Sequence, residues 1–168
     1  GAEYASLVER ARRGTLWGGL QSSTAFLPVD VAGLTLAALR RNHAPQRHAG
    51  AATLLRLASA EFCPAGVSRA DPFEVSRSFD DPKCQYHLLV DGGYVADVAG
   101  EDTFFLDPEA EAFHTVRFES EAGDLLVQLG WEFRRIDGCW RTAKWFWQDF
   151  RDEFRPGIGQ EEWTRICG

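Results

Sequence analysis

Two alternating runs that meet at Asp137-Gly138 constrain the fold more than any other feature of the sequence. The segment Asp124–Phe150 reads DLLVQLGWEFRRIDGCWRTAKWFWQDF, and an Asp-Gly pair between alternating runs is typical of a two-residue hairpin turn. Four of the six tryptophans lie on this segment. The sequence therefore predicts a long β-hairpin whose large apolar side chains build a core, line a pocket or contact a partner.

The turn also predicts which residues face each other across the hairpin. A regular register pairs Ile136 with Cys139, Trp131 with Lys144 and Gly130 with Trp145. The predicted core face then carries Leu125, Val127, Leu129, Trp131, Phe133, Trp140 and Phe146. The other face carries Gln128, Gly130, Glu132, Arg134, Arg141, Trp145 and Trp147, with Trp145 over the gap left by Gly130.

This second face combines arginines, a glutamate and two tryptophans, a composition that is enriched at protein interfaces. We expect such a patch to be covered, either by a partner or by the chain's own tail with Phe154 and Trp163. The candidate partner-binding residues are Trp145, Trp147, Arg134 and Arg141 on the hairpin, together with Trp17 and Trp163.

The first half of the chain has a helical period. The stripe Tyr4, Leu7, Val8 and Ala11 predicts a helix over Glu3–Arg13. Further helices are expected over Val31–Arg41, Gly50–Glu61 and Pro72–Phe79, with Asp30 and Asp71 as N-caps. In the second of these four helices, the residues expected to face inward are Val31, Leu34, Ala38 and Leu39.

The second half has a strand period. A short hairpin is expected from Gln85–Asp91 and Tyr94–Ala99 around Gly92-Gly93, followed by an acidic connector over Glu101–Pro108. Longer strands are predicted over Phe113–Ser120, Asp124–Ile136 and Cys139–Asp149. Helices followed by a meander of strands predict an α+β fold, with the helices packed on one face of a strongly bent antiparallel sheet.

Three parts of the chain are expected. Residues 1–25 form an N-terminal arm with a short helix, residues 26–150 form the domain, and residues 151–168 form an irregular C-terminal tail. The chain opens at Gly1 and has no methionine, which indicates a processed or trimmed product from which a targeting segment could have been removed.

Charge and composition exclude several classes. A formal net charge of −7 argues against nucleic acid, whose binding needs an excess of Lys and Arg. No apolar run approaches the ~20 residues of a transmembrane helix, although peripheral association with a membrane complex stays compatible with the sequence. The four cysteines Cys63, Cys84, Cys139 and Cys167 have no metal-ligand spacing and favour free thiols in a reducing compartment. No metal or cofactor is predicted.

One stretch of the chain resembles a known family. Ala38-Leu39-Arg40-Arg41-Asn42-His43-Ala44-Pro45, then Gly50, then Leu57-Ala58-Ser59 is similar to the signature of an uncharacterised family of plant, algal and bacterial proteins, with Tyr86-His87-Leu88-Leu89 and Gly138-Cys139-Trp140 as further matches. His43 stands where the family usually has Asp, and Leu57 where it usually has Phe. The resemblance covers roughly Val29–Phe150 and implies a nuclear transport factor 2-like cone and a chloroplast setting, but no mechanism.

Few residues suggest catalysis. His87 and Asp91 lie four apart on an expected strand, hence on one face, with Tyr94 nearby across the turn. His43 and His48 flank Pro45 but lack further metal ligands. The sequence therefore favours a non-catalytic interaction or accessory subunit of a larger, chloroplast assembly, or a homodimer. The alternative is a small-molecule enzyme or carrier, isomerase- or dehydratase-like, that uses the cavity of the cone.

Overall fold

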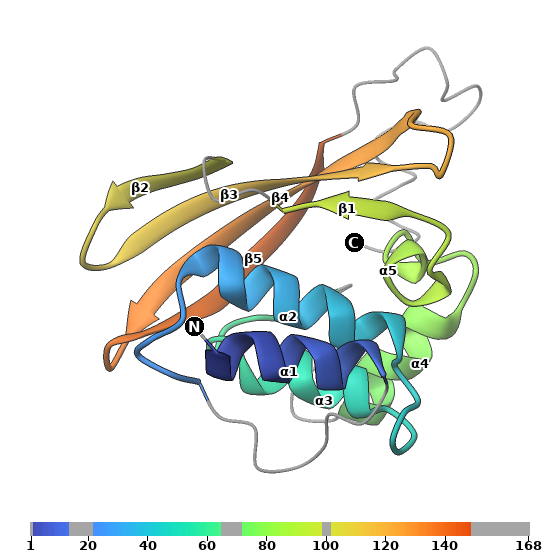
Figure 1. The fold of residues 1–168 in the computed structure, drawn as a ribbon, viewed down its shortest axis with the longest axis horizontal. Coiled ribbons are helices and arrows are strands. Elements are labelled where there is room, and N and C mark those ends of the chain that lie inside the picture. Colours follow the sequence, from blue (N-terminus) through green and yellow to red (C-terminus); the bar gives the residue numbers. More distant parts are fainter. Residues whose placement is uncertain (1, 14–21, 65–71, 99–101, 149–168) are drawn as a thin grey trace.

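The computed structural model describes residues 2–13, 22–64, 72–98 and 102–148, and places helices on one side of an antiparallel sheet (Figure 1). The helices are α1 (Ala2–Arg12), α2 (Pro28–Arg40), α3 (Ala49–Arg56), α4 (Pro72–Asp80) and α5 (His87–Asp91). The strands are β1 (Val95–Asp97), β2 (Thr103–Asp107), β3 (Glu111–Glu119), β4 (Leu125–Ile136) and β5 (Cys139–Gln148). The predicted α+β class, with helices first and an antiparallel sheet second, is confirmed.

The sheet runs in the order β1-β3-β4-β5, and β2 also pairs with β3. β1 and β2 lie along the same edge of β3, because β1 pairs with its last residues and β2 with its first. At the tip of the β4–β5 hairpin, Asp137 and Gly138 have φ angles of 52° and 78°. Both are positive, as a type I′ turn requires, so the predicted two-residue turn is confirmed.

The regular hairpin register is correct near the turn and wrong farther from it. Phe133 pairs with Thr142 as predicted, but Glu132 pairs with Lys144, so Ala143 is an extra residue in β5. Beyond this bulge Trp131 pairs with Trp145, and Gly130 pairs with Phe146. Because side chains alternate along a strand, the slip by one residue moves Trp145 and Trp147 to the face that was assigned to Phe146.

The bulge has a physical reason in the charge of Lys144. In the regular register Lys144 pairs with Trp131 on the core face, where an unpaired charge is costly to bury. In the structure Lys144 is exposed and lies opposite Glu132, so that opposite charges face each other across the two strands. Phe146 takes the place predicted for Trp145, and its ring covers Gly130, where an added Cβ would lie 2.4 Å from the Phe146 Cε2 atom.

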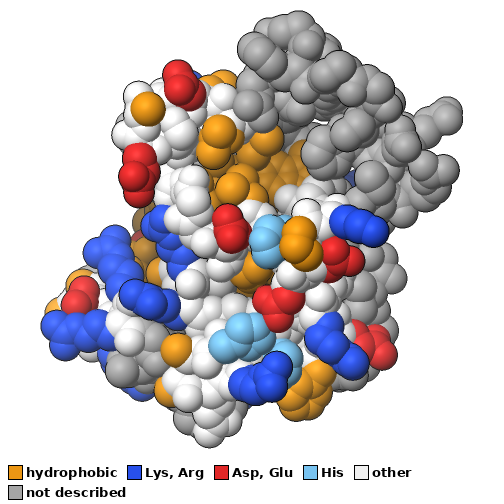
Figure 2. All heavy atoms as spheres, turned by 90° about the vertical axis from the view of Figure 1, so that its right-hand side faces the viewer, with side chains coloured by type: hydrophobic (Ala, Val, Ile, Leu, Met, Phe, Trp, Pro, Cys, Tyr) orange, Lys and Arg blue, Asp and Glu red, His pale blue; other side chains and the backbone are white. Residues whose placement is uncertain are grey.

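The core lies between the inner sheet face and the helices. Leu129, Trp131 and Phe133 from β4 are at most 1% exposed, which confirms their predicted inward direction. Val31, Leu34, Ala38 and Leu39 of α2 are also buried, as predicted. In the face shown in Figure 2, apolar side chains gather in a hollow near the sheet, whereas charged and histidine side chains gather on the helical layer.

Two predicted segments are wrong. Gln85–Asp91 is not a strand, because His87–Asp91 forms α5 and Gly92, with a φ of 83°, ends this helix in the left-handed conformation. Glu101–Pro108 is not merely a connector, because Thr103–Asp107 pairs with β3. In both places a local signal was ambiguous: glycine ends helices as well as turning hairpins, and acidic residues flank a Thr-Phe-Phe run with high strand propensity.

The predicted inward stripe of α1 is confirmed, whereas the predicted N-cap of α2 is wrong. In α1, Ala11 is 1% exposed, and Tyr4, Leu7 and Val8 pack partly buried against the core, so the predicted stripe is confirmed. Asp30 is not the N-cap of α2, since Leu27 occupies that position and the Asp30 carboxylate accepts the Leu27 backbone N–H at 2.8 Å. That residues 1–25 form a separable arm stays a prediction, and the expected tail over 151–168 lies outside the described residues.

The motif residues that carry the family resemblance hold elements together. Gly50 lies so close to α2 that an added Cβ would be 2.6 Å from the Ala38 carbonyl oxygen. The buried Asn42 accepts the Ala51 backbone N–H at 3.0 Å and so satisfies a free donor at the start of α3. Leu57 and Ser59 exchange backbone hydrogen bonds with Thr142 at 3.0 and 2.8 Å, which ties the end of α3 to β5. The motif therefore has a structural explanation in this chain.

Three further sequence expectations concern membrane-spanning helices, the cysteines and the end of α3. None of the helices in the described ranges is long and apolar enough to cross a membrane. Among the described residues, Cys63, Cys84 and Cys139 form no disulfide with one another, and Cys167 lies outside the described residues. The helix expected over Gly50–Glu61 ends at Arg56, after which the chain turns to meet β5.

Candidate functional site

Trp145 and Trp147 lie on the inner face of the sheet. Trp145 is 6% exposed, and its ring centroid lies 5.1 Å from that of Phe62 and 5.1 Å from that of Trp131. Trp147 lies 5.7 Å from Tyr86 and 5.7 Å from Phe118 by the same measure. Their assignment to the outer face is therefore wrong, because the bulge at Ala143 reverses the side of β5 from which they project.

Arg134 and Arg141 are paired across β4 and β5. Arg134 Nη1 lies 3.6 Å from the Glu61 carboxylate, and Arg141 Nη1 donates to the Arg56 carbonyl at 3.0 Å. These contacts fasten the segment after α3 to the hairpin, so the two arginines are not joined to the tryptophans as one patch. Trp17 and Trp163 lie outside the described residues.

Among the described helices and strands, β2 carries the most large exposed apolar side chains. Phe104 is 63% exposed, Phe105 is 42% exposed and Leu106 is 63% exposed, and they are consecutive. In the part of the chain that the structure describes, β2 pairs only with β3, so its other edge is open. Figure 1 shows β2 at the end of the sheet away from α4 and α5. An apolar edge strand of this kind is a template for pairing with another chain.

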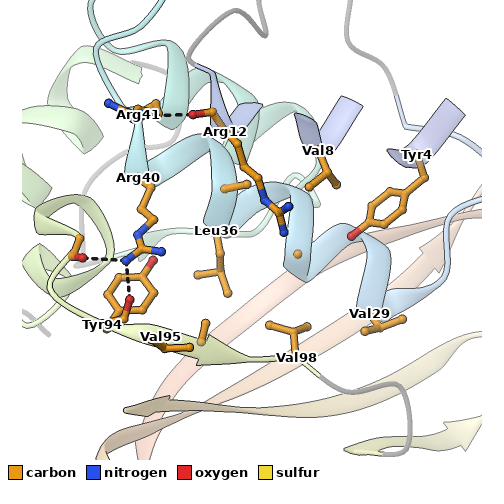
Figure 3. Close-up of a pocket in the computed structure, with 14 residues that line it drawn as sticks. Tyr4, Val8, Arg12, Val29, Leu36, Arg40, Arg41, Tyr94, Val95 and Val98 are labelled. Atoms are coloured by element: carbon orange, nitrogen blue, oxygen red, sulfur yellow. Dashed lines mark hydrogen bonds between the residues drawn. The ribbon is translucent and has the colours of Figure 1, made fainter. Parts of the chain in front are cut away.

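A groove of about 650 Å³ lies between α1, α2 and β1 (Figure 3). Three arginines reach it, namely Arg12 from α1, Arg40 from the end of α2, and Arg41, which follows α2. Tyr4 and Tyr94 also line it, and the remaining wall is mainly aliphatic. Burial raises the pKa of Tyr94 to about 12, with Arg40 acting in the opposite direction, so this phenol stays protonated at neutral pH.

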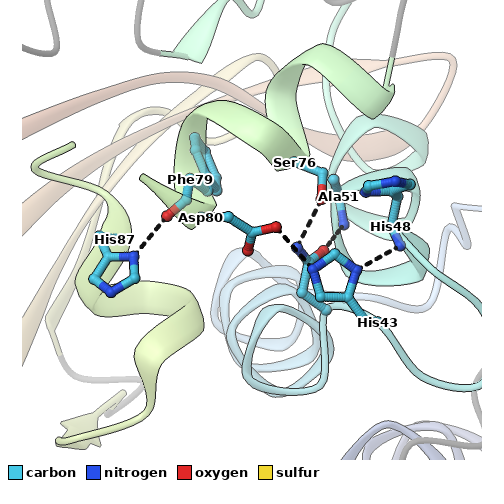
Figure 4. A network of polar contacts seen from close by, with 8 residues as sticks. His43, His48, Ala51, Ser76, Phe79, Asp80 and His87 are labelled. Carbon is cyan, nitrogen blue, oxygen red and sulfur yellow. Dashed lines mark hydrogen bonds and ion pairs between the residues drawn. The ribbon is translucent and has the colours of Figure 1, made fainter. Parts of the chain in front are cut away.

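The structure does not bring His87, Asp91 and Tyr94 together as one catalytic group. His87 and Asp91 are neighbours on helix α5 rather than on a strand, with Nε2 and Oδ1 3.6 Å apart. His87 Nδ1 lies 2.9 Å from the Phe79 carbonyl oxygen (Figure 4). Tyr94 is 2% exposed and lies under the Arg40 guanidinium, 4.5 Å from the ring centroid. His87 and Asp91 therefore lie side by side on α5, whereas Tyr94 is buried elsewhere, under Arg40.

The loop after α2 carries the polar network shown in Figure 4. His43 Nε2 lies 2.8 Å from Asp80 Oδ2, and its Nδ1 accepts the His48 backbone N–H at 3.1 Å. His48 Nδ1 lies 2.6 Å from the Ser76 hydroxyl, which also accepts from Asn42. Ser76 is fully buried, so it is not reachable as a nucleophile. The described residues contain no group of three or more side chains placed to hold a metal ion.

Three polar atoms on the inner sheet face have no hydrogen-bond partner among the described residues: His114 Nε2, Trp145 Nε1 and Trp147 Nε1. His114 is fully buried, and its Nδ1 lies 2.8 Å from the Thr103 hydroxyl. Burial lowers the pKa of His114, while Asp102 and Asp97 act in the opposite direction. Buried polar atoms of this kind are usually satisfied by water or a ligand.

Sequence reasoning missed the groove and the β2 surface. Residues Tyr4, Val8 and Arg12 are spaced by four and therefore share a helical face, as do Val29, Gly33 and Ala37. The spacing was visible, but the meeting of the two faces depends on tertiary packing. The Phe104-Phe105-Leu106 run was also visible in the sequence, but the acidic residues on both sides of it led to its interpretation as a connector.

No protein-family model matches this chain, and no curated protein or solved structure is significantly similar to it.

Proposed function

We propose that this protein is a non-catalytic interaction module, an accessory subunit of a larger assembly, whose contact surface is the open edge of β2. The observation that carries the proposal is the run Phe104-Phe105-Leu106, exposed over an edge strand. Soluble monomers seldom leave such a strand uncovered, because its free N–H and C=O groups and apolar side chains pair readily with another chain. The partner adds an extended segment to this edge.

The charges around β2 indicate the kind of partner. Asp102, Asp107 and Glu111 are exposed beside the apolar run. Antiparallel pairing of β2 with a second copy of itself would bring acidic residues close together, and like charges facing each other are destabilising. A segment with apolar residues between Lys or Arg residues has complementary charge. We therefore favour a different, basic polypeptide over a homodimer.

The catalytic candidates support the same class. A cone enzyme needs an acid or base and an oxyanion donor that converge on one cavity. His87 and Tyr94 are engaged by backbone carbonyl groups or by Arg40, and Ser76 is buried within its own network.

The nuclear transport factor 2-like cone and the chloroplast setting enter the proposal through the family resemblance. The order of helices followed by a sheet adds support to the cone.

Affinity purification from the native source tests the proposal. The bait variants are Phe104→Ser and Leu106→Ser, and the control is Leu27→Ser, which removes a leucine that is 56% exposed at another site. A stoichiometric partner should be retained by the unmodified chain and by Leu27→Ser, lost with the β2 variants, and weakened by salt. Retention by the β2 variants, or self-association of the pure protein that they abolish, would contradict a basic foreign partner.

A second candidate is a small-molecule carrier or enzyme that uses the interior of the cone. The unpartnered atoms of His114, Trp145 and Trp147 favour it, because they are buried donors or acceptors on one sheet face. Native mass spectrometry of the protein from its native source distinguishes the candidates. A retained small molecule that is lost in His114→Phe and Trp145→Phe would support the carrier, whereas an unliganded mass would leave water as the partner of these atoms.

A further inference from the structure

We propose that the groove between α1, α2 and β1 binds a small amphipathic anion, in which a carboxylate or phosphate group is attached to an aliphatic body. The charges of the groove carry this inference. Although the chain has a formal net charge of −7, the charged residues that line the groove are Arg12, Arg40 and Arg41, with no acidic side chain among its described lining residues. Arginines on the lining of a groove attract an anion into it, and here the carboxylate that acts on the groove, Asp30, lies near Tyr4 without being one of the lining residues.

Arg40 is held in a fixed orientation at one end of the groove. Its Nη2 donates to the Gly92 carbonyl at 2.7 Å and also to the Tyr94 carbonyl, and its guanidinium lies over the Tyr94 ring. Arg41 Nε donates to the Arg12 carbonyl at 3.2 Å, which fixes the end of α1 beside α2. Binding to a preorganised guanidinium loses less side-chain entropy, so the site is suited to a planar or tetrahedral anion.

The Arg12 guanidinium is available to a ligand. Figure 3 shows its side chain extending from α1 toward the cavity, on the side where the Tyr4 hydroxyl also points. Among the described residues, no hydrogen bond or ion pair engages this guanidinium, whereas the next residue, Arg13, is paired with Glu9 at 2.8 Å. Charged hydrogen bonds between arginine and an oxyanion are the strong ones, so Arg12 is the expected main contact.

The rest of the groove fits a hydrocarbon. Its aliphatic wall consists of Val8, Val29, Leu36, Ala37, Val95 and Val98. A volume of about 650 Å³ lies within the range of small-molecule sites, and pockets of this type bind apolar bodies with a few polar groups for orientation. The site is separate from β2, so its test does not depend on the proposed interaction surface.

Calorimetric titration of the full chain with decanoate and decyl phosphate tests the inference. Decan-1-ol lacks the charge and acetate lacks the aliphatic body, and both should bind about tenfold or more weakly than the better of the two amphipathic anions. Arg12→Gln should weaken that anion by about tenfold or more, and Arg13→Gln should not. Ala37→Leu, which extends a side chain into the groove, should also weaken it while leaving the thermal midpoint near that of the unmodified chain.

Several outcomes would overturn the inference. One is decan-1-ol binding as tightly as decanoate and decyl phosphate, which would show that the arginines do not select an anion. Another is an equal effect of Arg12→Gln and Arg13→Gln, which would indicate diffuse attraction. The inference would also be overturned if neither anion showed saturable binding at millimolar concentration.

Discussion

Trp145 and Phe146 exchange roles between the regular hairpin register and the bulged one, so their alanine variants test the fold directly. Trp145 is 6% exposed and contacts Phe62, Phe79, Tyr86 and Trp131. A tryptophan buries about 150–250 Å², which at about 25 cal/mol per Å² gives roughly 4–6 kcal/mol as an upper estimate. We expect Trp145→Ala to lower the free energy of unfolding by about 3–5 kcal/mol.

Phe146 is half-buried on the outer face, so Phe146→Ala should cost about 1–2 kcal/mol. Trp145→Phe keeps an aromatic ring and removes an indole N–H that has no described partner, so it should cost far less than Trp145→Ala. Urea unfolding followed by far-UV circular dichroism gives the midpoints and slopes for all three variants. A larger loss for Phe146→Ala than for Trp145→Ala would refute the bulge at Ala143 and restore the regular register.

Three further predictions follow from close contacts and burial. Gly130→Ala should lower the free energy of unfolding by about 1–3 kcal/mol, because the added Cβ meets the Phe146 ring. This loss of stability should disappear in a Phe146→Ala background, and additive effects in the double-mutant cycle would contradict the contact. Gly50→Ala should lower the free energy of unfolding by about 1–3 kcal/mol or more, since its Cβ would lie 2.8 Å from the Asn42 Cα atom and 2.6 Å from a carbonyl oxygen of α2. An unchanged thermal midpoint would show that the helices are not packed so closely. Because burial lowers the pKa of His114, the unfolded state binds the proton more tightly, so the free energy of unfolding should fall as the pH drops below about 6.5. His114→Gln should make this fall smaller in urea unfolding measured at a series of pH values. Urea midpoints that fall equally with pH in both proteins would contradict the prediction.

Much of the fold was predictable from neighbours along the chain. The turn at Asp137-Gly138 depends on two residues that tolerate a positive φ, and the helical stripe of α1 depends on a spacing of three and four. The three long strands and the α+β order follow from similar local periods. The candidate sites were less predictable, because a surface is defined by which elements stay uncovered. Phe104 and Leu106 were visible in the sequence, but their exposure was not.

The sequence by itself determined the local elements and the hairpin turn, whereas tertiary structure decided which faces of those elements meet. A strand keeps its alternation only until a bulge interrupts it, and the bulge at Ala143 is stabilised by burying Trp145 and by moving Lys144 outward. The segment His87–Asp91 fits either a strand or one helical turn, and its packing through Leu89 selects the helix. The groove is decided in the same way: Arg12 and Arg40 lie far apart in the chain, and only the packing of α1 on α2 brings their charges to one place. The physical reason is that local backbone preferences amount to tenths of a kilocalorie per residue, while the burial of one large side chain contributes several kilocalories.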